Sequence, residues 1–159
     1  PQNAWNVLQG IETLSVRMEK HCSNALKMVD YLLNHESVAW VSHPSAPDNP
    51  DYELAKKLLP KGTGSMIAFG IKGGKEAGAE FINNVKLSSH LANVGDTRTL
   101  VIHPASATHS QMDEKTLKLA NMSQDMIRLS VGIEDIEDIK NDFENGFRAA
   151  KKPRLVANQ

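Results

Sequence analysis

The sequence predicts an α/β or α+β domain, in which helices pack on one small sheet. Two observations support this fold class: short apolar strands alternate with amphipathic helices along the chain, and no repeat or low-complexity segment interrupts them. The third is the length, because a chain of about 150 residues can form one domain with a substantial core. This chain has 159 residues, of which 40% are hydrophobic.

The first element is a long amphipathic helix over residues 1–34, with one bend near Gly10. Its apolar stripe has spacings of three and four and consists of Trp5, Leu8, Ile11, Leu14, Met18, Cys22, Ala25, Met28 or Val29, and Leu32. About 30 residues make a helix of roughly 45 Å, which is longer than a small core requires. We therefore expect this helix to bridge to another domain.

The middle of the chain alternates between short strands and helices. The expected strands are residues 38–41, 65–71, 91–94 and 99–103, and the expected helices are 52–59, a segment after Gly73 and 113–121. Gly95 and Asp96 separate the third and fourth strands, which predicts two strands joined by a turn.

The last strand has the clearest alternation, because Ile127, Leu129 and Val131 recur at every second position. Arg128 must then point away from the core. A helix follows, with apolar residues at Ile133, Ile136, Ile139, Phe143 and Phe147 and with Glu134, Asp135, Glu137 and Asp138 in its first turn, where acids complement the helix dipole. Residues 153–159 are expected to form a loose tail.

Charge and composition exclude several classes of protein. The 18 Lys and Arg residues nearly balance 19 Asp and Glu residues, so the net charge of -1 argues against nucleic-acid binding. No apolar run approaches the roughly 18 residues that span a membrane, and no signal peptide is recognisable. We expect a soluble, cytoplasmic protein without a membrane partner, and its single cysteine, Cys22, fits a reducing compartment.

Most candidate motifs do not carry chemistry. The glycines before Lys75 do not form a phosphate loop, because Phe69 and Glu76 occupy positions where that motif needs glycine and Ser or Thr. His103 and His109 share a polar loop but have no nearby carboxylate partner, so we expect no metal site. Arg128 remains, either as a surface arginine or as a bidentate ligand for a carboxylate.

Several blocks resemble the C-terminal region of the Cys/Met-metabolism family of pyridoxal-phosphate enzymes. The most specific blocks are Ala92–Asp96, Leu100–Ser106, Thr108–Gln111 and Ile127–Glu134, and the resemblance extends from Asn3 to about Arg148. It implies the small domain of a fold-type-I enzyme, with a mainly antiparallel sheet, helices on its outer face, a connecting helix over residues 1–34 and a substrate-binding domain over 35–152.

Within the family, Phe69–Gly74 and Ala92–Asp96 are most similar to the sulfhydrylases. That resemblance implies a transferase of methionine and cysteine metabolism, which replaces the γ-acetoxy group of O-acetylhomoserine by sulfide. Methionine γ-lyases and cystathionine synthases or lyases are the alternatives within the family. A noncatalytic binding or assembly module is the alternative from another class.

The resemblance also implies how the work is divided between domains. It places the lysine that binds pyridoxal 5'-phosphate in a preceding domain, so we expect no catalytic or cofactor-binding residue in this chain, and we expect the chain alone to be inactive. The resemblance also implies assembly as a homotetramer. Arg128 matches the family arginine that binds the substrate α-carboxylate, and Asn93 matches a second residue that contacts this carboxylate. Ala92 and Val94 match residues that line the site, and Thr108 matches a threonine that orients the arginine.

Overall fold

A computed structural model of the protein describes residues 1–107, 114–119 and 122–151. Its strands are β1 (Val38–Ser42), β2 (Met66–Ile71), β3 (Ser89–His90), β4 (Leu100–Ile102) and β5 (Met126–Ser130). The α-helices are α1 (Gln2–Glu12), α2 (Leu14–Leu33), α3 (Tyr52–Leu58), α4 (Gly74–Asn84), α5 (Glu114–Leu119) and α6 (Ile136–Ala150), and a 3-10 turn, η1, covers Pro104–Ser106.

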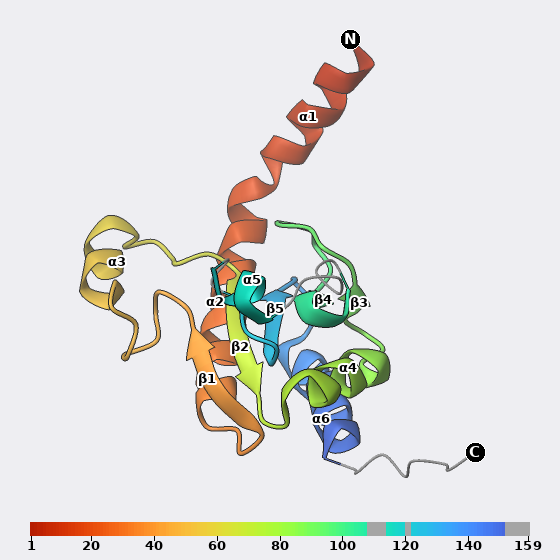
Figure 1. Cartoon of the computed structure of the whole chain (residues 1–159). Coiled ribbons are helices and arrows are strands. Elements are labelled where there is room, and N and C mark those ends of the chain that lie inside the picture. The colour runs from red at the N-terminus through yellow and green to blue at the C-terminus, as the bar shows by residue number, and fades with distance from the viewer. Residues whose placement is uncertain (108–113, 120–121, 152–159) are drawn as a thin grey trace.

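The five strands form one sheet in the order β1-β2-β5-β4-β3. Every neighbouring pair is antiparallel except β3 and β4, which are parallel, so the expected mainly antiparallel sheet is confirmed. Helices α2, α4 and α6 contribute to a common core with β2 and β5 (Figure 1). Four fully buried phenylalanines from β2, α4 and α6 pack ring against ring at its centre: Phe69, Phe81, Phe143 and Phe147.

The predicted first helix is present but divided at Thr13, three residues beyond the bend expected at Gly10. Helix α2 buries its stripe in the core, whereas α1 projects away from the sheet and buries no residue (Figure 1). The predicted apolar stripe thus continues across both helices, but only its second half contacts the domain. Cys22, on α2, is half-buried and unpaired, and its Sγ packs close to Gly62.

The hairpin expected around Gly95 is wrong. Residues 91–94 form no strand, and Leu91 and Val94 are exposed. The chain instead enters the sheet earlier, at β3, which pairs parallel to β4 and therefore cannot be joined to it by a tight turn. Local hydrogen bonds hold the intervening segment as a loop over residues 91–99.

The remaining strands and helices lie close to their predicted positions. Helix α6 begins three residues later than the apolar pattern indicated, because Asp135 caps it by accepting the backbone N–H of Glu137 at 2.8 Å. The predicted tail at 153–159 lies outside the described residues. Among the helices that the structure describes, none is long and apolar enough to cross a membrane.

Candidate functional site

Arg128 lies at the centre of the sheet, on the face opposite the core. Its neighbours in β5, Ile127 and Leu129, are fully buried, and strict alternation turns the Arg128 side chain the other way. In the register of the sheet, Arg128 lies opposite Ala68 of β2 and Ile102 of β4. The predicted outward orientation is therefore confirmed, and the side chain is half-buried.

The Arg128 side chain lines an open cavity of about 340 Å³. The cavity extends over β2 to the loop after β1, and its lining consists of Ser42, His43, Pro44, Asn49, Asp51, Met66, Ile67, Ala68 and Arg128. Ala68 lies directly between Ser42 and Arg128 in the register. Small side chains beside the arginine leave space above the sheet for a ligand of a few heavy atoms.

The guanidinium has donors available for such a ligand. Arg128 Nη2 donates to the backbone carbonyl of Asn93 at 3.4 Å, and the guanidinium makes no other hydrogen bond to the residues that the structure describes. A guanidinium offers five N–H groups and stays charged at every relevant pH. A carboxylate is the ligand that best satisfies two parallel donors of this kind.

His43 contributes a neutral side chain to the same cavity. It is buried, and its Nδ1 accepts the backbone N–H of Ser45 at 3.2 Å and lies 2.7 Å from the Ser45 hydroxyl. Burial lowers the pKa of His43, which outweighs the opposing effect of the Gly64 carbonyl. The histidine is therefore uncharged near neutral pH, and Arg128 is the cation among the described lining residues.

The loop over residues 91–99 brings Asn93 to Arg128. Asn93 Oδ1 accepts the backbone N–H of Val94 at 2.8 Å, which leaves the amide Nδ2 without a partner among the described residues. Ala92 and Val94 flank it on the exposed part of the loop. The structure thus places Asn93 next to Arg128, and the Asn93 backbone, not its side chain, makes the contact. Thr108 lies outside the described residues.

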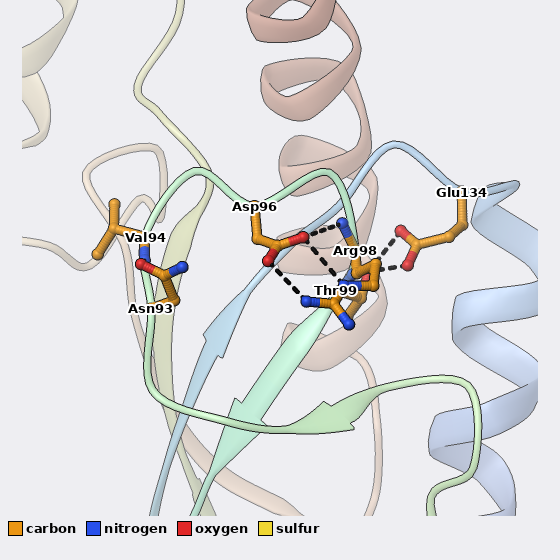
Figure 2. A network of polar contacts seen from close by, with 6 residues as sticks. All are labelled: Asn93, Val94, Asp96, Arg98, Thr99 and Glu134. Atoms are coloured by element: carbon orange, nitrogen blue, oxygen red, sulfur yellow. Dashed lines mark hydrogen bonds and ion pairs between the residues drawn. The ribbon is translucent and has the colours of Figure 1, made fainter. Parts of the chain in front are cut away.

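Sequence reasoning missed one contact beside this site. The sequence predicts Glu134 in the first turn of the last helix, but its carboxylate instead binds Thr99 at the end of the Asn93 loop (Figure 2). The signal available was the unbroken block from Arg128 to Glu134, in which Gly132 allows a close approach of two backbones. The partner, 35 residues away, could not be read from the sequence.

Fold and site together define a small α/β domain with Arg128 beside an open cavity, on the sheet face opposite the core. The family model for Cys/Met metabolism PLP-dependent enzymes matches residues 1–148. The chain therefore belongs to this family of pyridoxal-phosphate enzymes, as the sequence resemblance indicated.

Individual relatives agree with the family assignment. The O-acetyl-L-homoserine sulfhydrylase of Corynebacterium glutamicum is 52% identical over 92% of this chain and 34% of its own length. O-acetyl-L-homoserine sulfhydrylase 1 of Thermus thermophilus is 49% identical over 92% of this chain and 35% of its own length. An L-methionine gamma-lyase of Fusobacterium nucleatum is 45% identical over 92% of this chain and 37% of its own length. The chain thus spans about a third of the length of these relatives.

Solved structures show the same fold. A putative O-acetylhomoserine (thiol)-lyase from Campylobacter jejuni, which carries pyridoxyl-lysine phosphate, has a TM-score of 0.85 and 38% identity, with 93% of this chain and 35% of that chain covered. A cystathionine gamma-lyase from Lactobacillus plantarum, in complex with L-serine, also has a TM-score of 0.85, with 33% identity and coverages of 94% and 39%. The expected fold class is confirmed.

Proposed function

We propose that this chain is the C-terminal domain of an O-acetylhomoserine sulfhydrylase, a transferase that forms homocysteine and acetate from O-acetylhomoserine and sulfide. The similarity to two sulfhydrylases, at 52% and 49% identity, supports this choice within the family. In this proposal residues 1–34 connect to the preceding, cofactor-binding domain, and residues 35–152 bind the substrate.

The observation that carries the proposal is the Arg128 guanidinium, which lines the cavity beside Asn93 and has donors without a partner among the described residues. The cofactor supplies the electron sink of the reaction when it is bound by the preceding domain. Arg128 binds the α-carboxylate of the amino-acid substrate and fixes its orientation. The described lining of the cavity contains this arginine and no lysine, which supports a role in holding the substrate and not the cofactor.

The neighbouring residues complete the proposed site. The Nδ2 of Asn93, which has no partner in the described part of the chain, donates a further hydrogen bond to the carboxylate, while Ala92 and Val94 shape the edge of the site. Thr108 orients the arginine. A charged, fixed guanidinium binds a carboxylate strongly only when its fork is held in place, so these supporting groups affect the rate as well as the affinity.

Kinetics of the complete protein test this proposal. We expect turnover of O-acetylhomoserine with sulfide and slower or no elimination from methionine or cystathionine alone. Replacement Arg128→Ala should lower kcat/KM by roughly 100-fold or more, because a buried charge-assisted pair contributes about 2–5 kcal/mol. Unchanged catalytic efficiency in Arg128→Ala would remove the carboxylate site from the proposal.

A lyase is the second candidate within the family, favoured by the 45% identity to an L-methionine gamma-lyase. The same substrate panel separates the two reactions, since a lyase releases its products without added sulfide. A noncatalytic module remains the alternative from another class, and an intact mass of the native protein that equals this chain alone would favour it. Assembly as a homotetramer and a cytoplasmic location belong to the enzyme proposal.

A further inference from the structure

One carboxylate fastens the loop that carries Asn93 to the turn after β5 (Figure 2). Glu134 Oε1 accepts the backbone N–H of Thr99 at 2.6 Å, and Oε2 accepts the Thr99 hydroxyl at 2.8 Å. The same hydroxyl accepts the backbone N–H of Gly132 at 2.9 Å. Thr99 is completely buried, so each of these donors depends on its protein partner for a hydrogen bond.

The turn that carries Glu134 is itself fixed from the other side. The buried Asn24 of α2 donates through Nδ2 to the carbonyls of Gly132 at 3.1 Å and of Glu134 at 2.9 Å. The buried His21, one turn earlier in α2, places its Nδ1 2.6 Å from the carbonyl of Val131. Because this turn directly continues β5, the Glu134 carboxylate is held in a fixed relation to Arg128.

Further contacts hold the part of the loop that follows Asn93. The backbone N–H of Ile133 donates to the carbonyl of Thr97 at 2.9 Å, which adds a second link between turn and loop. Asp96 accepts hydrogen bonds from the backbone and side chain of Arg98, an ion pair that lowers the pKa of Asp96 to about 2. The loop is therefore held at residues 96–99, three residues beyond Asn93.

Gly132 shows how closely the two segments approach. A Cβ at this position would overlap the Glu134 carboxylate and the backbone between Arg98 and Thr99. Any side chain there would push the loop away from β5 or displace the carboxylate. The sequence therefore provides both the acceptor and the space that this contact needs.

We propose that Glu134 is a positioning residue, which sets the distance between the Asn93 loop and the Arg128 guanidinium. The inference rests on the proposed function, since the group so positioned is the substrate-carboxylate site. It assigns Glu134 no contact with the substrate. Its effect is on how well Asn93 and Arg128 bind the same carboxylate.

Glu134→Ala in the complete protein tests this inference. We expect KM for O-acetylhomoserine to rise roughly tenfold, because a small misplacement of a positioning group costs one to two orders of magnitude. KM for sulfide and the pyridoxal absorbance per chain should stay at their wild-type values. Glu134→Gln, which keeps one acceptor oxygen, should recover part of the loss. Glu137→Ala is the matched control, because Glu137 pairs with Lys140 on the surface of α6 and should leave all constants unchanged.

Hydrogen exchange provides a readout that does not depend on activity. In Glu134→Ala the amides of residues 97–99 should exchange faster, while those of β5 stay protected. A wild-type KM together with faster exchange would overturn the positioning role, and unchanged exchange would overturn the contact itself. An Arg128→Ala variant with wild-type kcat/KM would overturn the proposed function, and the inference with it. If Glu134→Ala does not fold, Glu134→Gln carries the same comparison.

Discussion

The guanidinium of Arg128 contacts Asn93 through the main-chain carbonyl of Asn93, although 35 positions separate the two residues in the chain. The identity of the side chain at position 93 therefore does not determine this contact. The asparagine amide adds a separate donor to the same site. The two groups should differ clearly in their contribution to substrate binding.

Asn93→Ala should raise KM for O-acetylhomoserine about tenfold, since it removes one neutral donor to a charged carboxylate. Arg128→Ala should cost considerably more, because it removes the charge and two donors together. Steady-state kinetics of the complete protein measure both variants. Equal losses would mean that the Asn93 side chain, and not its carbonyl, orients the guanidinium.

Asp142→Asn should destabilise the fold by about 2 kcal/mol, because the buried Asp142 carboxylate accepts three successive backbone N–H groups. Oδ1 binds the amides of Lys86 and Leu87 at 2.6 and 3.0 Å, and Oδ2 binds that of Ser88 at 2.9 Å. Asparagine would turn an N–H₂ group towards one of these donors. Urea unfolding should show a lower midpoint with an unchanged slope. Asp138→Asn, an exposed change on the same helix, is the control and should shift the midpoint by far less.

Gly78→Ala should also destabilise the fold, although alanine is the better helix former by about 1 kcal/mol. A Cβ on Gly78 would lie 2.5–2.9 Å from the His103 ring, which is buried and hydrogen-bonded to Ser106 and Gln124. Overpacking of this kind costs about 1–3 kcal/mol and exceeds the gain in helix propensity. Thermal unfolding measures the balance. Gly10→Ala, in open space on α1, should not lower the midpoint, and a neutral Gly78→Ala would show that the ring can move aside.

The stability of the protein should fall as the pH drops below about 6.5, partly because of His35. This ring is stacked on Phe147 with a centroid distance of 4.0 Å, and its Nε2 lies 3.3 Å from Glu144. Burial lowers the pKa of His35, outweighing the opposite effect of Glu144. Since the unfolded chain then binds the proton more readily than the folded one, stability is full above the unfolded pKa of 6.5 and is lost as the pH falls through the folded pKa.

Urea unfolding between pH 7.5 and roughly pH 5 measures this dependence. His35→Gln should reduce the slope without abolishing it, because burial also lowers the pKa of His43 and of His103. An identical slope in the variant would show that His35 keeps its ordinary pKa in the folded protein.

The parts of the fold that the sequence predicted well are those whose signal is local and strong. Strict alternation over five residues determined the orientation of Arg128, because a strand with fully apolar alternate positions has one way to face a core. The helix stripe ending at Phe147 was equally clear. The expected hairpin failed because Leu91 and Val94 are apolar but exposed, and apolar residues on a surface loop resemble a short strand in sequence.

The supporting groups of the site were harder to predict because their partners are distant. Glu134 precedes a helix and has a local explanation as a dipole-matching acid, yet its hydrogen bonds go to Thr99. Asn24 lies within an otherwise regular helix, and only the folded structure shows its amide bound to two carbonyls of another segment. Pairings across more than thirty residues require the topology to be known first.

Because α1 and α2 meet at Thr13, the direction of the exposed apolar stripe of α1 depends on how α2 is rotated against the core. Helix α2 fixes its own angle by burying Met28 and Leu32, and the exposed Leu8 and Ile11 of α1 then point in a direction that this angle dictates. A single residue inserted at Thr13 would turn the α1 stripe by about 100° while leaving the domain intact. Length changes at this position would therefore reorient α1 without unfolding anything, which makes the residue count between Leu8 and Met28 a constraint in its own right.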